Sequence, residues 1–300
     1  MNSSPGGPGA PDGLVGLDDL RPLMFSIAYR MTGSVGDAED IVQEAVIRTY
    51  RAARQGTMVE SLKAFVTTTT TRLAIDHLRS ARVQREAYVG TWLPEPLLSD
   101  PAPGPAERAE MSDSLSLAFL VLLESLSPVE RAVFLLREVF GYDYGEIAEA
   151  VGKSEPNCRQ IFTRARRHID EGRPRFEASR RQGTELTELF LAALSGGDIE
   201  AFIDLLAPDV TMYGDGGGKA PAASAPVHGR ERVARLLRGL ARQAEKWIAD
   251  VRPAQVNGQP GIIAYDRDGN LFGVIAFEYA DGQVQAIRSQ INPDKLRHLR

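Results

Sequence analysis

Apolar residues recur at helical spacing in two separate stretches of the chain, residues 17–88 and 112–170. Within residues 34–52 the inward stripe of one predicted helix consists of Ala38, Ile41, Val42, Ala45, Val46 and Tyr50. A second predicted helix covers residues 61–88. The stretch between the two blocks, residues 91–110, is rich in proline and cannot form one regular element. The pattern therefore predicts two all-α blocks joined by an irregular linker.

The pattern changes from Thr184 onward, where short helices give way to alternating strands. We predict helices at 185–195, 198–206 and 229–245, and strands at 210–213, 247–256, 261–266, 271–280 and 283–291. Asp268-Gly269 and Asp281-Gly282 supply hairpin turns between the last strands. This C-terminal block is therefore predicted to be α+β, in contrast to the all-α blocks before it.

Residues 143–169 have the pattern of a helix-turn-helix. Asp143 and Glu146 form a capping box for the first helix, and Gly152 ends it. The second helix carries Pro156 in its first turn, where a missing N–H costs little. We expect that second helix to bury Ile161, Phe162 and Ala165 and to present its arginines outward. Such a helix fits the major groove of DNA. A further capping box at residues 127–130 begins another helix upstream.

The net charge of −5 does not exclude DNA binding, but it requires the basic residues to gather on particular surfaces. The single cysteine, Cys158, excludes an internal disulfide and fits a reducing cytosol, so we expect a cytoplasmic protein. Within the helix-turn-helix it is either a small filler or a redox-sensitive thiol. No apolar run approaches the roughly 18 residues of a membrane span, and the first 13 residues lack the charge and the apolar core of a signal peptide.

Two helices of the first block each allow two interpretations. The acidic face of residues 34–52 is either a solvated surface, with acids placed to suit the helix dipole, or a docking face for a basic partner. The basic end of residues 61–88 is either solvated or a DNA contact. A second DNA-binding candidate in the same chain favours the DNA contact.

These blocks together resemble a bacterial RNA polymerase sigma factor of the extracytoplasmic-function class. Residues 21–50 resemble the first half of sigma region 2, including its D-x-x-Q-E signature at Asp40, Gln43 and Glu44, and residues 72–82 resemble the second half. Residues 126–169 resemble region 4. The C-terminal block is similar to the SnoaL-like fold, a cone-shaped α+β barrel that a subgroup of this class carries. Three short segments resemble signatures of that subgroup: Trp92–Pro96, Asp215–Lys219 and Asn292–Leu296.

The resemblance divides the chain into six parts. They are a disordered N-terminus (1–16), region 2 (17–88), a linker (89–111), region 4 (112–172), a joint (173–183) and a SnoaL-like domain (184–300). It implies binding to core RNA polymerase, through the clamp helices of the largest subunit and through the flap, and binding to promoter DNA. The implied core contacts are Asp37, Asp40, Gln43 and Glu44. The implied contacts for melting the −10 element are Arg72, Arg79, Arg82 and Arg85. The implied contacts to the −35 element are Glu155, Asn157, Arg159, Gln160, Thr163, Arg164, Arg166 and Arg167.

The resemblance also implies that the C-terminal domain regulates the sigma factor. The expected regulatory contacts are Trp92, Pro94, Glu95, Asp215, Gly217, Lys219, Asn292, Pro293, Asp294 and Lys295. Residues 92–96 are alternatively a simple structural anchor. Some SnoaL-like domains are enzymes, for which Tyr213, Asp215, His228 and Asp266 are candidates, but a capping or loop role suits His228 better. We expect no catalytic residue, cofactor or metal, and we leave open a small ligand inside the cone.

Two other functions remain as alternatives. One is a conventional helix-turn-helix regulator that binds duplex operators unaided. The other is a SnoaL-like enzyme with a DNA-binding appendage. The acidic helix and the separate basic helix argue against the first.

Overall fold

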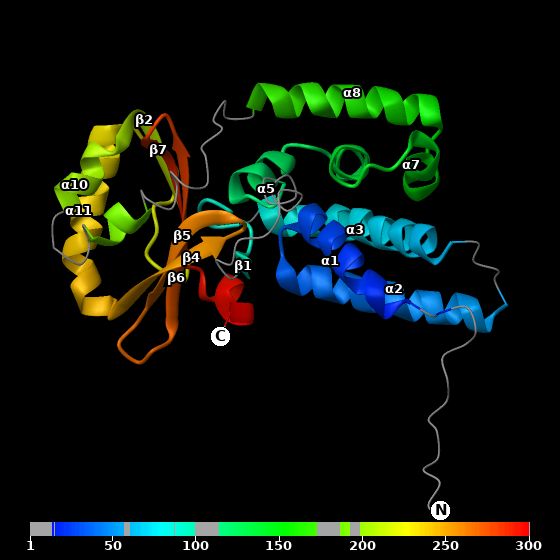
Figure 1. The fold of residues 1–300 in the computed structure, drawn as a ribbon, viewed down its shortest axis with the longest axis horizontal. Coiled ribbons are helices and arrows are strands. Elements are labelled where there is room, and N and C mark those ends of the chain that lie inside the picture. The colour runs from blue at the N-terminus through cyan, green and yellow to red at the C-terminus, as the bar shows by residue number, and fades with distance from the viewer. Residues whose placement is uncertain are drawn as a thin grey trace, which may run out of the picture. The chain divides into compact units, whose positions relative to one another are not determined.

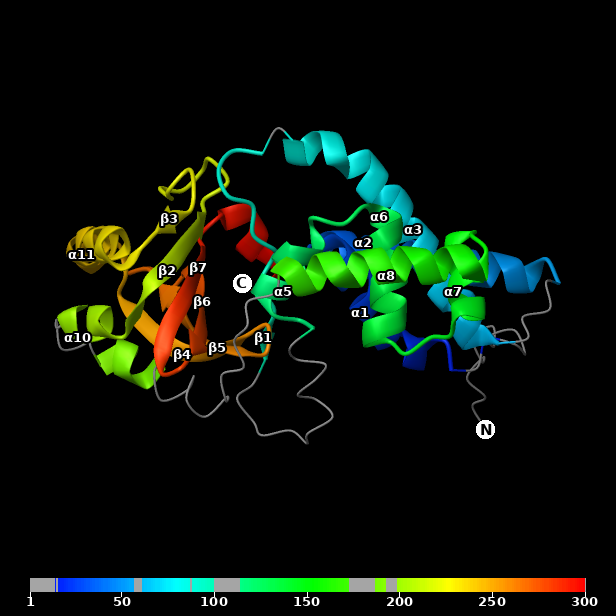
Figure 2. The same ribbon diagram turned by 90° about the horizontal axis from the view of Figure 1, so that it is seen from above.

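The computed structural model describes residues 14, 16–56, 61–86, 88–99, 114–172, 187–192 and 199–299. The chain forms two compact units (Figures 1 and 2). The first contains residues 1–82 and 126–171, and the second contains residues 83–125 and 172–300. Residues 1–13 and the predicted joint at 173–183 lie outside the described residues.

The described part of the first unit is helical. After the short η1 (Asp18–Leu20) its helices are α1 (Arg21–Thr32), α2 (Val35–Arg54), α3 (Leu62–Glu86), α6 (Pro128–Phe134), the π-helical turn η2 (Leu135–Val139), α7 (Tyr144–Val151) and α8 (Glu155–Gly172). Gly33 ends α1 with a positive φ of 68°, which glycine adopts without strain. Ser34 then caps α2, because its hydroxyl accepts a hydrogen bond from the Asp37 N–H at 3.2 Å.

One core of the first unit lies between α1, α2 and α3. It is built from Leu17, Met24, Val42, Ala45, Val46 and Val66. The predicted inward stripe of α2 is confirmed except at its end, where the prediction for Tyr50 is wrong. Tyr50 is 39% exposed, and Thr49 is fully buried instead. Thr49 can be buried because its hydroxyl donates to the carbonyl of Ala45 at 2.8 Å, inside its own helix.

The helix-turn-helix is present as predicted. Both capping boxes form, at Ser127 with Glu130 and at Asp143 with Glu146. The side-chain hydrogen bond to Ser127 lowers the pKa of Glu130. Gly152 ends α7 in the left-handed conformation. The residues expected to be buried in α8 are buried, namely Ile161, Phe162 and Ala165.

Two polar contacts join α1 and α3 to the segment that leads into the helix-turn-helix, residues 128–142. The guanidinium of Arg131 donates to the carbonyl of Met31 at 2.5 Å, at a buried position. The hydroxyls of Thr67 and Tyr142 lie 2.8 Å apart, also buried. Because these groups would lose solvation without a partner, each contact favours the packed arrangement of the first unit.

The second unit is built on one mixed sheet of seven strands. The strands are β1 (Leu98–Ser99), β2 (Leu206–Asp215), β3 (Val227–His228), β4 (Asp250–Val256), β5 (Gln259–Tyr265), β6 (Leu271–Ala280) and β7 (Gln283–Gln290). Their order is β1-β4-β5-β6-β7-β2-β3, and only β2 and β7 pair in parallel. The helices of this unit include α5 (Leu117–Leu123), a helical segment at 187–192, α10 (Ile199–Asp204), α11 (Arg230–Trp247) and the 3-10 helix η3 (Pro293–Leu299).

The sheet carries an apolar core on each face. On one face α10 and α11 cover a cluster that includes Phe202, Val233 and Phe277. On the other face Leu117 of α5 and Leu296 of η3 pack against β4 and β6. The α+β prediction is therefore confirmed. Among the described residues, no helix is both long and apolar enough to span a membrane.

The hairpins show what the sequence pattern captured and what it missed. The predicted turns at Asp268-Gly269 and Asp281-Gly282 are present, and φ is positive at Gly269, Asp281 and Gly282. A third turn at Asn257-Gly258, with φ of 51° and 75°, was not predicted. It has the positive φ at both central residues that a type I′ turn requires. The strand expected from residue 247 begins only at Asp250, because α11 continues to Trp247.

Candidate functional site: a buried carboxylate that holds the linker

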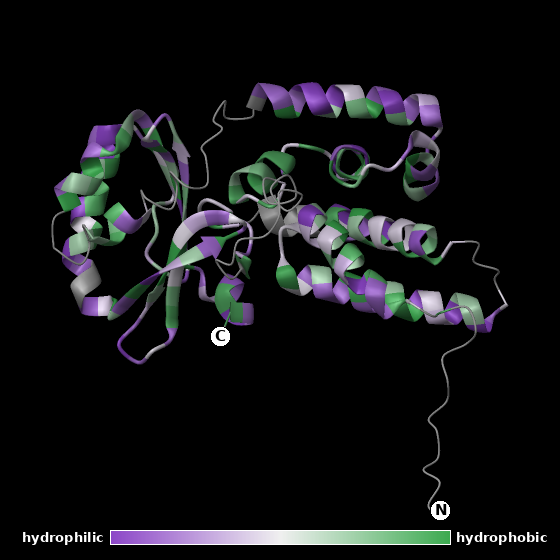
Figure 3. Ribbon diagram, viewed as in Figure 1, coloured by the Kyte–Doolittle hydropathy of each residue, from purple (hydrophilic) through white to green (hydrophobic). Residues whose placement is uncertain are grey.

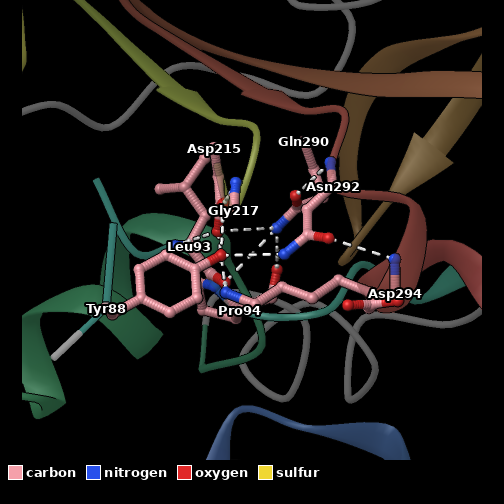
Figure 4. A network of polar contacts seen from close by, with 9 residues as sticks. Tyr88, Leu93, Pro94, Asp215, Gly217, Gln290, Asn292 and Asp294 are labelled. Atoms are coloured by element: carbon pink, nitrogen blue, oxygen red, sulfur yellow. Dashed lines mark hydrogen bonds and ion pairs between the residues drawn. The ribbon is translucent and has the colours of Figure 1, made fainter. Parts of the chain in front are cut away.

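Asp215, the last residue of β2, is fully buried and collects hydrogen bonds from five donors (Figure 4). Two donors come from residues 88–99, the last residue of predicted region 2 and the first part of the linker, which are together called the linker below: the Leu93 N–H at 2.8 Å and the Tyr88 hydroxyl at 2.5 Å. The N–H of Gly217 donates at 3.0 Å and the amide of Gln290 at 3.2 Å. The fifth donor is a lysine ammonium, described next. A buried carboxylate needs such partners because it has left water.

The fifth donor, Lys295, balances the charge of Asp215. Its Nζ lies 2.7 Å from Asp215 Oδ2 and 2.6 Å from the carbonyl oxygen of Leu93. The same ammonium lies 4.5 Å from the ring centres of both Tyr88 and Trp92. Lys295 therefore binds the linker through a backbone carbonyl and two aromatic faces while it neutralises Asp215.

Burial and the hydrogen bond to Asp215 together raise the pKa of the Tyr88 hydroxyl well above its usual range. Ionised Tyr88 would place a second negative charge beside the carboxylate. The neutral hydroxyl also accepts a hydrogen bond from the Asn292 side chain at 2.9 Å. Tyr88 thus stays a neutral donor, which the contact with Asp215 requires.

The segment Asp215–Lys219 meets Asn292–Leu296 beside this carboxylate. Gly217 has a positive φ of 57°, and a Cβ there would collide with the side chain of Asn292. Only glycine fits at this position. Lys219 pairs with Asp294 at the exposed edge, and that hydrogen bond lowers the pKa of the Asp294 carboxyl.

A second set of contacts holds the linker further along. Asn257, buried in the unpredicted turn, accepts from the Leu97 N–H at 2.8 Å through its side chain and donates its own N–H to the Leu97 carbonyl at 2.7 Å. Its amide also donates to the carbonyl of Leu115 at 2.9 Å. His298 Nε2 lies 2.8 Å from the carbonyl oxygen of Pro96. The two residues of β1 then pair antiparallel with β4, so the linker extends the sheet by one strand.

The structure thus brings the segments Trp92–Pro96, Asp215–Lys219 and Asn292–Leu296 to one place. Pro94 is buried, and its carbonyl accepts from the amide of Gln290 at 3.3 Å. Glu95 is half-buried, 3.9 Å from His298. Sequence reasoning missed Asn257 and His298. The Asn-Gly dipeptide was a usable signal for the turn, but nothing in the sequence indicated that its asparagine faces the linker.

The expected polymerase-binding residues lie on α2 but differ in their surroundings. Asp40 and Gln43 are exposed. Glu44 pairs with an arginine one turn further on, at 2.8 Å. Asp37 is half-buried and lies 3.2 Å from Nε2 of His77 on α3. Asp37 therefore pairs with a residue of another helix, whereas Glu44 pairs within α2.

A shallow groove of about 570 Å³ runs between α1 and α2 beside these residues. Its lining consists of Arg21, Pro22, Phe25, Glu39, Val42 and Gln43. Its lining combines the apolar residues Pro22, Phe25 and Val42 with charged and polar ones, a mixture common at protein–protein interfaces.

The arginines of α3 that were expected to contact the −10 element differ in their surroundings. Arg72 donates to the carbonyl oxygens of Glu149 at 2.6 Å and Ala150 at 3.1 Å. These are the last carbonyls of α7, so Arg72 caps a helix of the helix-turn-helix. Arg79 is exposed and, among the described residues, makes a single 3.4 Å ion pair with an aspartate on its own helix. The side chains of Arg82 and Arg85 lie outside the described residues.

The expected −35 contacts lie on α8, which Figure 3 draws mainly in the hydrophilic colour. All are exposed: Glu155, Asn157, Arg159, Gln160, Thr163, Arg164, Arg166 and Arg167. Glu155 pairs with Arg159 at 3.1 Å, and the Arg159 guanidinium lies 4.8 Å from the ring centre of Tyr144. Cys158 is fully buried beneath this surface, and burial raises the pKa of its thiol. That environment fits the small-filler interpretation.

The candidate catalytic residues of the SnoaL-like domain are each engaged locally. The Arg288 guanidinium lies 4.7 Å from the ring centre of Tyr213. His228 is exposed and lies 3.1 Å from the Thr211 hydroxyl. Asp266 accepts two backbone N–H groups of its own hairpin turn, at 2.9 and 2.8 Å. Asp215 holds the linker, as described above.

The sequence left open whether a small ligand binds inside the cone. Aromatic rings occupy the space there, between the helices and the sheet. Phe190, Phe202 and Phe277 meet edge to face, with ring centres 4.2 to 5.9 Å apart. Tyr279 lies 5.8 Å from Phe277. This part of the interior is packed as a hydrophobic core.

Comparison with known proteins places each part of the chain. Family models match at residues 17–83 (Sigma-70 region 2), 116–169 (Sigma-70, region 4) and 187–289 (SnoaL-like domain). The ECF RNA polymerase sigma factor SigJ of Mycobacterium tuberculosis is 36% identical over 290 residues, which cover 93% of this chain and 91% of that protein. The probable ECF RNA polymerase sigma factor SigI of the same species is 34% identical over 284 residues and 93% of each chain.

A solved structure agrees with these matches along the chain. The crystal structure of the extracytoplasmic function sigma factor SigJ from Mycobacterium tuberculosis has a TM-score of 0.74 and 33% identity. It covers 94% of this chain and 98% of that one. The chain therefore belongs to the extracytoplasmic-function class of RNA polymerase sigma factors and carries a SnoaL-like domain after its two sigma regions.

Proposed function

We propose that this sigma factor directs core RNA polymerase to specific promoters and that its SnoaL-like domain controls the process by holding the linker between regions 2 and 4. The observation that carries the proposal of control is the buried Asp215, which takes hydrogen bonds from both Tyr88 and Leu93 of the linker. A folded domain that binds a connecting segment through a buried ion pair restricts the path of that segment.

Docking on the polymerase is assigned to α2 and the groove beside it. Asp40 and Gln43 are exposed at that edge, and Phe25 lines the groove. The apolar part of the lining would supply most of the affinity, whereas the acids would steer association and fix the register. We assign Glu44 to the same face. We assign Asp37 a smaller contribution to polymerase binding, because its carboxylate already pairs with His77.

Promoter contacts are assigned to α3 and α8. Arg79 is exposed on α3 and suits the phosphates of a melted −10 element. On α8 the first turns reach base edges of the −35 element, and the later arginines contact phosphates. Arg72 becomes available for DNA only if it leaves its carbonyl partners at the end of α7.

Control through the linker follows from the number and placement of its restraints. Leu93 is fully buried and is held by Asp215 and Lys295, whereas Leu97 is held by Asn257 and continues into β1. Residues 88–99 thus cannot follow another path while they stay bound to the domain. Binding to polymerase would compete for the same segment, so the domain sets a free-energy cost on productive assembly.

The test is transcription with purified core polymerase from a randomised promoter library. Promoter-specific product that appears only with this chain supports the sigma assignment. Asp215→Asn should then change the product yield while core binding, measured by size-exclusion chromatography, stays as in the wild type. Equal yield from both proteins would remove the proposed control and leave the sigma assignment intact.

A point substitution tests this better than deletion of residues 184–300. Leu117 of α5 and Leu98 of β1 pack in the core that η3 and the sheet complete. Deletion would expose those leucines, so a change in output would mix lost control with lost folding. Substitution of one buried carboxylate leaves both cores in place.

A further inference from the structure

Helix α11 carries a concentration of positive charge that neither sigma region explains. Residues Arg230–Trp247 contain five arginines and one lysine against two glutamates, a net charge of +4 in a chain whose net charge is −5. One face of α11 packs on the sheet through Val233, Ala234 and Leu237. The arginines that emerge beside this buried face form what we call the α11 ridge: Arg230, Arg235, Arg238 and Arg242.

The α11 ridge lines a groove of about 510 Å³. Ile203 of α10, together with Glu231, Ala234 and Gly239 of α11, completes the lining. Gly239 leaves its part of the groove open, since no atom lies within 4 Å of the Cβ that another residue would add. A ligand can therefore approach the helix closely between the arginines.

The arginines of the ridge differ in how far they are already neutralised. Arg238 makes a two-point ion pair with Glu200 of α10, at 2.7 and 2.6 Å. Arg235 and Arg242 are exposed, and neither forms a hydrogen bond or an ion pair with any residue that the structure describes. Two guanidinium groups are thus available to an outside anion on the same side of the helix.

The spacing of the charges favours an extended anion over a compact one. From Arg230 to Arg242 the ridge spans about 18 Å, at roughly 1.5 Å per residue. A single phosphate group needs cations that converge on one point, whereas these follow the helix. One strand of duplex DNA presents a phosphate about every 3.4 Å along the axis, so several phosphates fit within this length.

The composition of the groove argues against a protein partner. The central parts of protein–protein interfaces are apolar and poor in charge. Here Ile203 and Ala234 are the apolar side chains of the lining, and both are buried by their own domain. Nucleic-acid interfaces are much more positively charged, and the arginine fork matches phosphate oxygens.

We propose that the α11 ridge contacts the phosphate backbone of promoter DNA while the sigma factor is bound to polymerase. The proposal rests on the proposed function to the extent that the chain must bring polymerase to a promoter. It adds a third DNA contact to those of regions 2 and 4. The contact raises affinity without reading sequence, because it reaches phosphates and not base edges.

The experiment measures how salt weakens promoter binding by holoenzyme assembled from core polymerase and the full chain. Each neutralised phosphate contributes about 0.9 to the slope of log affinity against log salt for duplex DNA. Arg235→Ala/Arg242→Ala should therefore make the slope shallower by about 1.8. Between about 50 and 200 mM salt, wild-type affinity should fall roughly 12-fold more than that of the variant.

Two matched variants make the result specific. Arg235→Lys/Arg242→Lys keeps both charges and should keep the wild-type slope, since counterion release depends on charge. Arg252→Ala/Arg267→Ala removes two exposed arginines elsewhere on the same domain and should leave the slope unchanged. Thermal unfolding and core binding are measured for every variant.

The outcomes separate the two proposals. A wild-type slope in the alanine variant overturns the DNA contact and leaves the sigma function standing. Loss of core binding in that variant also overturns it, since the ridge would then bind polymerase. Failure of wild-type holoenzyme to form any promoter complex removes the proposed function and the third contact with it.

Discussion

Replacement of Asp215 by asparagine should release the linker from the SnoaL-like domain. The change keeps the shape of the side chain but removes its charge, so the ammonium of Lys295, 2.7 Å away, loses its counter-ion at a buried position. Breaking a buried ion pair from one side costs about 3–5 kcal/mol. Lys295 keeps the Leu93 carbonyl and two aromatic faces, so the lower end, about 3 kcal/mol, applies.

A cost of about 3 kcal/mol corresponds to a roughly 150-fold weaker hold on the linker. Hydrogen exchange reports this directly, because the N–H of Leu93 donates to Asp215 and is buried. We expect the protection of that amide to fall roughly 150-fold. Trp92 gives a second signal, since its ring lies against Lys295. The exposed Trp247, the only other tryptophan, is first replaced by phenylalanine.

Two further proteins test the reasoning. Asp281→Asn makes the same chemical change at an exposed hairpin position and should leave Leu93 protected. Asp215→Asn/Lys295→Met removes both charges and should weaken the linker contact by less than the sum of the single changes. If Asp215→Asn leaves both Leu93 protection and Trp92 emission unchanged, the buried pair does not hold the linker and the argument is refuted.

Three other predictions follow from contacts described above. Gly217→Ala should destabilise the domain by about 1–2 kcal/mol more than Gly282→Ala in thermal unfolding, because both positions have positive φ but only the first also collides with a side chain; equal losses would show that the collision is relieved. Arg72→Ala should lower the unfolding free energy of the first unit by about 1.5–3 kcal/mol through its two lost carbonyl contacts, whereas Arg79→Ala should change it by less than about 0.5 kcal/mol; denaturant unfolding compares them, and equal effects would contradict the capping role of Arg72. Burial raises the pKa of Tyr88 above its ordinary value of 10.0, so this hydroxyl keeps its proton more tightly when the linker is bound than when it is released. Binding of the linker to the domain is therefore at full strength below pH 10 and weakens as the pH rises above 10. Trp92 emission should therefore change above pH 10 in the wild type, and the same transition in Tyr88→Phe would assign it to another group.

The sequence was sufficient wherever a feature is decided within a few residues. A capping box joins two residues three apart, each side chain accepting from the N–H of the other, and both boxes were predicted correctly. The buried face of α8 follows from helical spacing, and the hairpin turns follow from residues that tolerate positive φ. The site residues of the linker and of the two C-terminal segments were named from family resemblance, and not from any pattern in the sequence.

Features that depend on distant contacts could not be predicted in this way. Asp215 is a buried receptor for the linker only because a segment about 120 residues earlier in the chain reaches it, and no periodicity encodes that meeting. The turn at Asn257 was not predicted, and its contacts with the linker join residues about 160 positions apart. Arg72 was expected to face DNA, but its guanidinium lies on the carbonyls that end α7. Tyr50 fitted the apolar stripe, yet the neighbouring Thr49 is buried in its place.

The pairing of β1 with β4 also protects the domain from unwanted association. β1 covers Gln255 and Val256 at the end of β4, so departure of residues 98 and 99 would leave the N–H and C=O groups there open to a strand of another chain. If the linker is released as proposed, this end of the sheet edge would become able to pair with another chain. The bound linker would thus limit aggregation through this strand edge in addition to restricting the path of the chain.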